Sequence, residues 1–310
     1  MRWRCAALAP IVAATAALGG CGLGAGEGPA GTWVTVTRDF GARALGSASA
    51  AQVSEGETAM RQLQRRFRVQ TRYGGGFVQA IDGVAGGTSQ GRRRDWFFYV
   101  NGIESGRGAA ATRLRPADRV WWDHHDWGAA MSIPAVVGSF PEPFRSGSGG
   151  KRLPVTIACA RGADAACDEV ARRLAGAGAS AGRGPIGGVP AAQTLRVVVG
   201  PWPRVRLDTT AQRLERGPAA SGVFARPDVS GRSLLLLDAR GRPAGRLAAG
   251  GGLVAATRDA DSQPTWVVTG IDHAGLMAAA RSLDERSLAR RFALALAGRR
   301  AISLPVGDSR

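Results

Sequence analysis

The stretch that decides the fold is residues 94–127, RDWFFYVNGIESGRGAAATRLRPADRVWWDHHDW, which holds four of the eight Trp and two of the three His residues. Its segment DWFFYV is rich in aromatic and β-branched residues, and Asn101-Gly102 follows directly. Because Asn-Gly supplies the two positive φ angles of a type I′ turn, we predict a strand, a tight turn with positive φ at both residues, and a returning strand. A further strand is predicted over residues 119–123, leading into the cluster WWDHHDW.

Strand and helix signals before this stretch complete a first domain over residues 32–130. Residues 32–38 predict a strand, residues 57–67 an amphipathic helix, and FVQAIDG at 77–83 a short strand. This order favours one helix lying across a sheet, an α+β arrangement of the β-grasp type. The pattern G-x-S-x-G at residues 87–91 lacks the flanking strand and helix of a nucleophile elbow, so a loop is predicted there.

Three motifs in this domain resemble the transcobalamin-like C-terminal domain, a β-grasp-type module of extracellular proteins. They are YGGGFVQAIDG, DWFFYVNG and GAAATRLRPADRVWW, within residues 32–128. Gly108-Ala109 matches the GA pair of that family, whereas Ala117 stands where the family has Gly. The resemblance implies one wall of a cleft for a small molecule, or for a cofactor of the cobalamin class by analogy only. The helical barrel that completes the cleft in vitamin carriers has no counterpart in this sequence.

The first 20 residues have the pattern of an export signal. Arg2 and Arg4 precede an Ala-rich apolar run that is too short to span a membrane. The sequence LGGC at 18–21 resembles a bacterial lipobox, which implies lipid on Cys21 and a chain held at the extracytoplasmic face of the cell membrane. A secretory signal with a chance cysteine is the alternative. Gly-rich residues 21–31 are then a flexible tether.

The two remaining cysteines, Cys159 and Cys167, are predicted to form a disulfide. Cys159 lies on the apolar face of a strand in LPVTIAC, and Cys167 on the apolar face of a helix that begins at Asp164. Closing so short a loop stabilises the folded chain by about 2.5 kcal/mol. A buried pair of free thiols is the alternative, less typical of an exported protein.

The formal net charge is +17, carried almost entirely by arginine. Such a surface attracts anionic neighbours such as lipid headgroups, wall polyanions or nucleic acid. The simpler interpretation is arginines scattered over solvated faces. The densest run, Arg92 to Arg94, is predicted in a loop without the aromatic platform of single-strand binders, so no specific nucleic-acid partner is expected.

The cluster at residues 123–126 allows several interpretations. In an extended chain His124 points to one face and His125 to the other, and neither face offers the three or four ligands that zinc requires. We therefore expect no metal site and no catalytic residue. The cluster either packs against the hairpin and the neighbouring domain or forms an aromatic wall facing a ligand. The candidate ligand-binding residues are Tyr99, Trp122, His124, His125, Asp126 and Trp127.

A second domain is predicted over residues 151–310, after an apolar connector at 131–150 whose flexible point is the Gly/Ser-rich run 146–150. Apolar runs such as SLLLLD at 233–238 and TWVVTG at 265–270 are typical of central strands, so we predict an α/β domain with a mainly parallel sheet.

Two helices are expected at the end of this domain. Asp272 is expected to cap a helix that runs to Leu283, and a capping box of Ser282 and Glu285 to open a second helix with Leu288, Phe292 and Leu296 on one face. Ligands of open α/β sheets bind at the carboxyl ends of strands. That rule makes Thr269, Gly270 and Asp272 the candidate site of the second domain.

These features favour a lipid-anchored extracytoplasmic protein that binds a small molecule, with membrane lipid and an uptake transporter as partners. Two other classes stay open. One is an envelope hydrolase or metal-dependent enzyme that uses residues 123–126, and the other is a structural envelope lipoprotein.

The lipid anchor gives the first prediction. Replacing Cys21 with Ser should abolish metabolic fatty-acid labelling and leave an unprocessed precursor, because only a thiol forms the thioether to diacylglycerol. Labelling that persists in Cys21→Ser contradicts the anchor.

Overall fold

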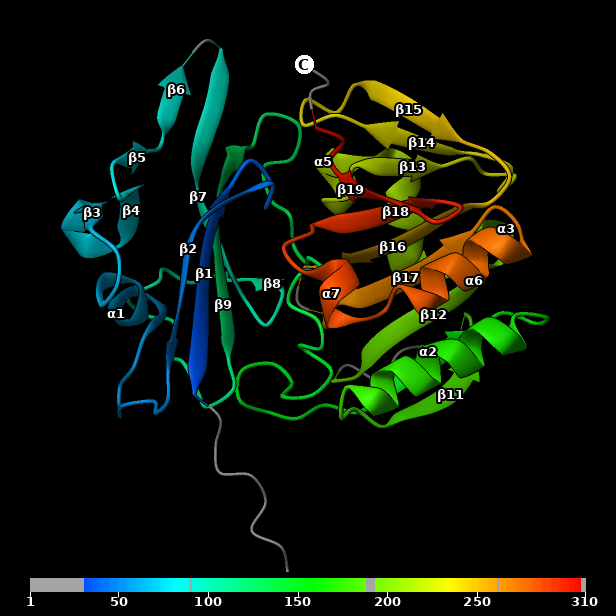
Figure 1. Ribbon diagram of the computed structural model, residues 1–310, viewed down its shortest axis with the longest axis horizontal. Helices are drawn as coiled ribbons and strands as arrows, with labels where there is room; N and C mark the ends of the chain where they lie inside the picture. The colour runs from blue at the N-terminus through cyan, green and yellow to red at the C-terminus, as the bar shows by residue number, and fades with distance from the viewer. Residues whose placement is uncertain (1–30, 90, 188–192, 261, 308–310) are drawn as a thin grey trace, which may run out of the picture.

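The computed structural model describes residues 31–89, 91–187, 193–260 and 262–307. It is a mixed α+β protein, mostly strands, with 19% helix. A sheet from the first half of the chain stands beside a larger sheet from the second half (Figure 1). No helix in the described ranges is long and apolar enough to cross a membrane. The predicted signal, Cys21 and the tether up to residue 30 lie outside these ranges.

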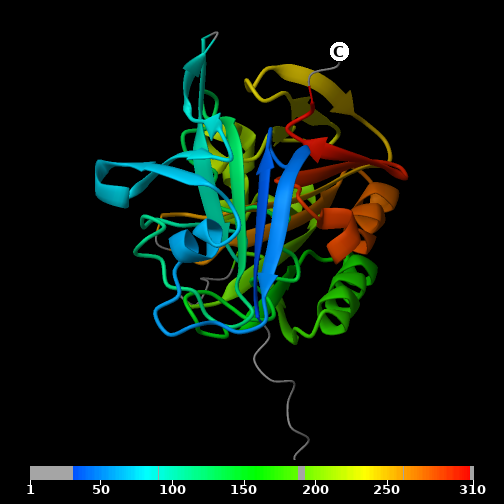
Figure 2. The ribbon, with the colours of Figure 1, turned by 60° about the vertical axis from the view of Figure 1, so that its left-hand side comes forward.

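The first half contains a mixed sheet in the order β2-β1-β9-β7-β6, with β8 paired to β7. Strands β1 and β9 are parallel, and the other pairings are antiparallel. A second, three-stranded sheet in the order β3-β4-β5 extends away from the body (Figure 2). The elements are β1 (Thr32–Arg38), β2 (Arg43–Ala50), α1 (Ala59–Gln64), β3 (Val69–Arg72), η1 (Tyr73–Gly75), β4 (Phe77–Ile81), β5 (Val84–Ala85), β6 (Gly87–Ser89), β7 (Arg92–Val100), β8 (Ile103–Glu104) and β9 (Arg119–Asp126).

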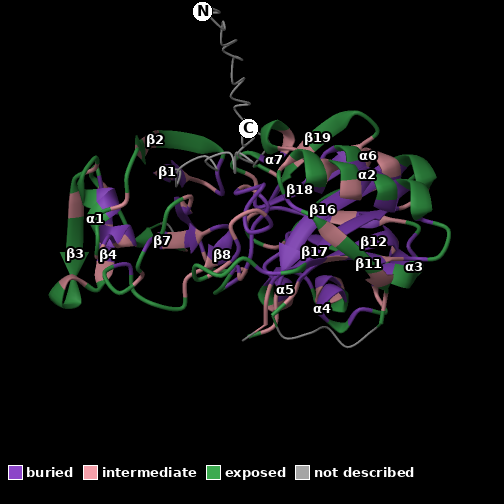
Figure 3. Cartoon of the chain, turned by 90° about the horizontal axis from the view of Figure 1, so that it is seen from below, coloured by how far each residue is buried: buried purple, intermediate pink, exposed green. Residues whose placement is uncertain are grey.

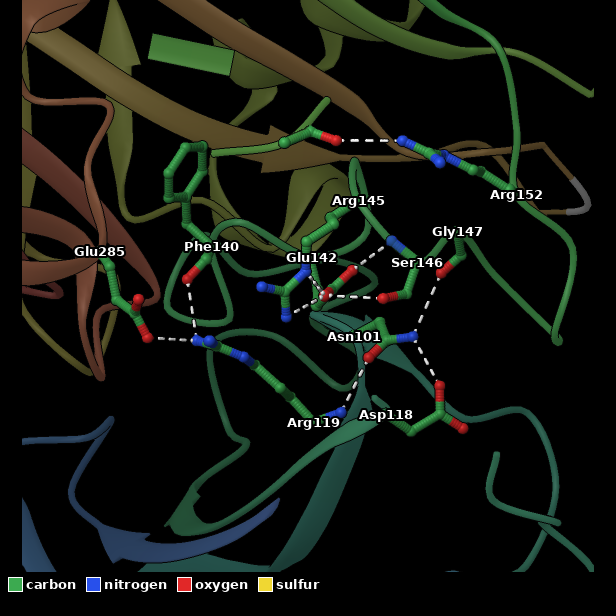
Figure 4. A network of polar contacts seen from close by, with 11 residues as sticks. Asn101, Asp118, Arg119, Phe140, Glu142, Arg145, Ser146, Gly147, Arg152 and Glu285 are labelled. Carbon is green, nitrogen blue, oxygen red and sulfur yellow. Dashed lines mark hydrogen bonds and ion pairs between the residues drawn. The ribbon is translucent and has the colours of Figure 1, made fainter. Parts of the chain in front are cut away.

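The predicted hairpin is confirmed. Asn101 and Gly102 have φ angles of 54° and 77° and join β7 to β8. A Cβ on Gly102 would lie 2.8 Å from the carbonyl oxygen of Val136, so the position also needs a residue without a side chain. The Asn101 amide donates to Asp118 and to the carbonyl of Gly147, which ties the turn to the connector (Figure 4).

Two details of the first half differ from prediction. Helix α1 covers Ala59–Gln64 and is shorter than the predicted residues 57–67. Thr58 caps its start by accepting a hydrogen bond from the Arg61 backbone N–H, and Arg65 is its C-cap. Within the segments predicted as loop, Gly87–Ser89 form strand β6, and Arg92 to Arg94 form the start of the antiparallel strand β7. Local composition favoured a loop, but backbone pairing with β6, together with pairing to β9 from Arg94 onward, makes the arginine run a strand. The β6–β7 hairpin reaches beyond the rest of the sheet (Figures 1 and 2).

The second half contains a seven-stranded sheet in the order β11-β10-β12-β17-β16-β18-β19. The four neighbouring strands β11, β10, β12 and β17 pair in parallel, as predicted. The pairings of β17 with β16, of β16 with β18 and of β18 with β19 are antiparallel. The elements are β10 (Val155–Cys159), α2 (Asp164–Gly176), β11 (Ala181–Pro185), β12 (Leu195–Pro201), α3 (Trp202–Val205), α4 (Thr209–Gln212), η2 (Arg213–Arg216), α5 (Pro218–Ser221), β13 (Ala225–Pro227), β14 (Leu234–Leu237), β15 (Pro243–Leu247), β16 (Gly251–Thr257), β17 (Thr265–Gly270), α6 (His273–Arg281), α7 (Glu285–Leu288), β18 (Ala293–Ala297) and β19 (Arg300–Leu304).

The prediction of a mainly parallel sheet is therefore wrong for half of its pairings. The apolar run SLLLLD was expected in the centre of that sheet, yet β14 belongs to a separate antiparallel sheet, β13-β14-β15. Leu234, Leu236 and Leu237 of β14 are buried in the core that the two halves share, and Leu235 is partly buried against it. An apolar strand can thus be covered without helices on both sides of a parallel sheet.

The disulfide between Cys159 and Cys167 is present and joins the end of β10 to α2. Helices α2 and α6 lie on the same side of the large sheet (Figure 1), and their apolar residues share one core with β10, β12 and β17. Asp272 caps α6 as predicted, with its carboxylate 2.8 Å from the Gly275 backbone nitrogen.

The prediction of a second C-terminal helix is wrong. Helix α7 is a single turn capped by Asp284 rather than Ser282, and Ala293–Ala297 form β18. The spacing of Phe292 and Leu296 suits a helix, but the sequence ALALA has the two-residue period of a strand equally well. Pairing with both β16 and β19 decides the outcome.

The two halves share one hydrophobic core. Buried side chains from the first sheet meet buried side chains from the connector and the second half. Figure 3 shows buried segments between the two sheets. Arg119, at the start of β9, binds the carbonyl of Phe140 at 3.1 Å and the carboxylate of Glu285 at 2.6 Å (Figure 4). The residues of this shared core include Phe40, Tyr99, Trp121, Ile133, Val136, Val223, Phe224 and Phe292.

Candidate functional site

Strand β9 presents its side chains to two different environments, as the alternation predicted. Trp121 belongs to the core shared with the second half, whereas Trp122 belongs to the core under α1. The two histidines follow the same alternation, because His125 contacts Phe292 of the second half and His124 contacts Trp96 on the α1 side. The cluster WWDHHDW therefore serves two separate surfaces.

On the inner face of β9 the carboxylate of Asp123 is completely buried and fully hydrogen-bonded. It accepts from the backbone nitrogens of Phe40 at 3.0 Å and Gly41 at 2.8 Å and from the Thr37 hydroxyl at 2.5 Å. The Nδ1 of His125 lies 2.9 Å from the same carboxylate. Because backbone N–H groups only donate, the arrangement suits the ionised, acceptor-only carboxylate.

His125 is enclosed by aromatic rings and is 1% exposed. Its ring stacks on Phe40 and Phe97, with centroids 4.7 and 4.5 Å away, and Phe292 contacts it edge-on at 5.3 Å. Tyr99 is also buried in this layer, and burial raises the pKa of its hydroxyl well above the ordinary value. These inner-face residues pack the two halves together.

Three of the residues predicted to form an aromatic wall facing a ligand are not exposed. Tyr99, Trp122 and His125 are closed to solvent, and Trp122 stacks on Phe98 with centroids 4.7 Å apart. A cofactor of the cobalamin class would need an open aromatic face, so these residues do not fit one.

On the outer face His124 lines a groove together with Arg92, Arg94 and the segment 85–89. We call this surface, of about 450 Å³, the His124 groove. The Nε2 of His124 lies 3.2 Å from the carbonyl oxygen of Ala85. A carbonyl only accepts, so Nε2 carries the hydrogen, and Nδ1 of the neutral ring is an acceptor. That Nδ1 is buried and has no hydrogen-bond partner among the described residues.

The electrostatics of the groove keep His124 neutral. Burial, followed by the charge of Arg94, lowers the pKa of His124 below its ordinary value of 6.5. The ring rests against Trp96, with centroids 5.1 Å apart, and Arg94 is held by the carboxylate of Asp39 at 2.8 Å. The site therefore combines fixed positive charge with an uncharged hydrogen-bond acceptor.

The last two candidates on β9 have polar partners within the chain. The carboxylate of Asp126 accepts from the Gly128 backbone nitrogen at 2.9 Å. Trp127 is half-buried, its indole N–H donates to Asp95 at 2.9 Å, and the Arg93 guanidinium lies 4.2 Å from the centroid of its ring. Neither lines the His124 groove.

Sequence reasoning missed the arginines and hydroxyls of the groove. Arg92, Arg94, Thr88 and Ser89 were assigned to a loop, yet they line the groove with His124. An alternating pattern in which Arg92 and Arg94 share a face with Trp96 was the available signal.

The second-domain candidates lie beside a very small depression. Thr269 and Gly270 line a space of about 10 Å³, which holds about one water molecule. The Asp272 carboxylate is occupied by the backbone nitrogens of Gly250 at 2.6 Å and Gly275 at 2.8 Å. A Cβ on Gly270 would collide with the backbone of Leu276, so this glycine serves close packing. The geometry leaves no room here for a ligand.

Residues 56–126 match a family model described as a domain of unknown function (DUF4430), which spans α1 to β9 and includes the His124 groove. A search of curated proteins finds no match. Among solved structures, the chain is similar to "a putative metal binding protein" from Ruminococcus gnavus, with a TM-score of 0.24 and 11% identity over 31% of this chain and 97% of that chain. Similarity at this level does not indicate what the present chain binds. The described residues contain no group of three or more His, Cys, Asp or Glu that could hold a metal ion.

The lowered pKa of His124 predicts a pH effect on stability. Below pH 6.5, the ordinary value, the unfolded chain gains a proton at this position more readily than the folded chain. Stability should therefore fall as the pH drops from 6.5 towards the lowered pKa, and His124→Gln should lose less over that window. Denaturant unfolding at several pH values measures the difference.

The matched control is Gln64→Ala, since Gln64 is exposed on α1, carries no ionisable group and should leave the pH profile unchanged. An identical loss of stability in His124→Gln and the wild type contradicts a neutral, buried imidazole.

Proposed function

We propose that the chain is a lipid-anchored, extracytoplasmic protein that binds a small molecule in the His124 groove. The observation that carries the proposal is the groove itself, whose wall brings the His124 ring together with the guanidinium groups of Arg92 and Arg94 and the hydroxyl groups of Thr88 and Ser89. A few polar side chains that converge on one concave surface are typical of sites for small molecules. The volume of about 450 Å³ lies in the range of small-molecule sites.

The fold supports this use of the groove. The groove is lined by residues of β6, β7 and β9 and by residues 85 and 86. The β6–β7 hairpin extends past the body of the molecule (Figure 1). We assign the first sheet and α1 to a β-grasp-like module, because one helix packs on a sheet whose parallel pair β1–β9 is central. In this proposal, lipid on Cys21 keeps the module at the membrane, close to an uptake transporter.

Binding is favoured over catalysis by the chemistry of the side chains. Arg92 and Arg94 keep their charge over the physiological pH range and transfer no proton. His124 is neutral, and its Nε2 hydrogen is held by the Ala85 carbonyl. Of residues 123–126, which the enzyme alternative uses, Asp123 and His125 are enclosed in the shared core, and only His124 lines this groove.

The experiment follows the side-chain nitrogens of the histidines by ¹H–¹⁵N NMR. Mixtures of neutral sugars, nucleosides, amino acids, carboxylates and phosphates are added to the mature protein. A ligand that binds beside the His124 ring in the groove should shift the ¹⁵N resonances of His124 and leave those of the exposed His273 in place. If no mixture moves the His124 resonance, the groove is not a binding site and the proposal fails.

A further inference from the structure

The first half carries a second groove, distinct from the His124 groove. It is lined by residues of α1 and β3, by the turn at residues 74–75 and by residues 110, 111 and 113, and its volume is about 710 Å³. We call it the Arg61 groove. It shares no lining residue with the His124 groove, so what it binds is independent of the function proposed above.

Much of the wall of the Arg61 groove is main chain. Five of the eleven residues that line it are Gly or Ala, whose side chains are too small to cover the peptide groups. Ala110 is exposed, and its backbone N–H and C=O have no hydrogen-bond partner among the described residues. A Cβ on Gly74 or Gly75 would meet no atom within 4 Å. Such a surface can exchange hydrogen bonds with the main chain of another segment.

Strand β3 contributes the edge of a sheet to the same groove. Thr71 of β3 lines the groove, and within the described residues β3 pairs with β4 alone. Backbone N–H and C=O groups on the outer side of an edge strand have no partner in the sheet and can pair with a further strand. Extended peptides bind to proteins in this way, and main-chain hydrogen bonds supply their affinity.

The charged side chains of the Arg61 groove are all positive. Arg61 and Arg113 line it, and no Asp or Glu does. The Arg61 guanidinium donates to a backbone carbonyl at 3.0 Å, and the Arg113 side chain forms no hydrogen bond or ion pair with another described residue. Glu55 and Glu57 precede α1 but do not line the groove, and Glu57 is bound to Arg65. The local charge therefore favours an acidic ligand.

We propose that the Arg61 groove binds an acidic peptide segment in extended conformation. The segment adds to β3 as a further strand and pairs its carboxylates with Arg61 and Arg113. Because alternate side chains of a strand point to the same face, a segment in which acidic residues alternate with uncharged ones suits the groove best.

Calorimetric titration of the mature protein with short peptides tests the charge. The probe is the hexapeptide Glu-Thr-Glu-Thr-Glu-Thr with an acetylated N-terminus and an amidated C-terminus, since Thr favours strands and is uncharged. Peptides with Gln or Lys in place of Glu are the controls. Two exposed ion pairs should make the Glu peptide bind about tenfold more tightly than the Gln peptide, and the Lys peptide should bind least.

Peptides methylated on backbone nitrogens test the strand pairing. Successive N–H groups of a strand point to opposite edges, so either the Glu nitrogens or the Thr nitrogens face β3. Methylation of the set that faces β3 should weaken binding about tenfold or more, because it removes main-chain donors. Methylation of the other set should leave the affinity nearly unchanged.

Variants of the protein locate the site. Arg61→Gln and Arg113→Gln should each weaken the Glu peptide about threefold and leave the Gln peptide unchanged. Arg204→Gln, at an exposed arginine on α3 in the other half, is the matched control and should change neither affinity.

Three results would overturn the inference. A Glu peptide that does not bind at millimolar concentration would leave the groove without this ligand. Equal affinity for the Glu, Gln and Lys peptides would remove the two arginines from recognition. Equal effects of methylating the two sets of nitrogens would remove the pairing with β3. The His124 resonance reports on the other groove, so the function proposed above is tested separately.

Discussion

The structure depends on one buried carboxylate, that of Asp123, at the junction of the two halves. Its oxygens collect hydrogen bonds from the loop after β1, through Phe40 and Gly41, and from Thr37 and His125. A buried charge is tolerated only when such donors surround it. By accepting these hydrogen bonds, the Asp123 carboxylate fixes the loop after β1, whose Phe40 packs against Phe224 and Phe292 of the second half.

The alternation of side chains along β9 links this junction to the candidate site. His125 faces inward and is sealed by aromatic rings, so the next residue back, His124, must face outward against Trp96. The same backbone that holds the halves together thus fixes the position of the imidazole in the groove. A site built on a strand rather than a loop is held rigidly, which favours selective binding.

Local signals in the sequence predict much of the fold. The Asn101-Gly102 turn and the Cys159–Cys167 disulfide follow from residue chemistry and periodicity. The strand β18 did not follow, because ALALA fits two periods and only pairing with distant strands decides between them. The groove was hidden for a similar reason: Arg92 becomes part of a site only when β6 pairs beside it. Which face of β9 is covered depends on the second half of the chain, so the sequence left both packing and ligand binding open as interpretations of one cluster.

The most direct test of this account is the unfolding free energy of Asp123→Asn, measured by denaturant titration. Asn has the same shape as Asp, but its NH₂ group would face N–H donors that now donate to the carboxylate. We therefore expect the unfolding free energy to fall by about 3 kcal/mol or more. Asp168→Asn, at an exposed carboxylate on α2, is the control and should stay close to the wild type. An Asp123→Asn protein within about 0.5 kcal/mol of the wild type would contradict a structure organised around this carboxylate.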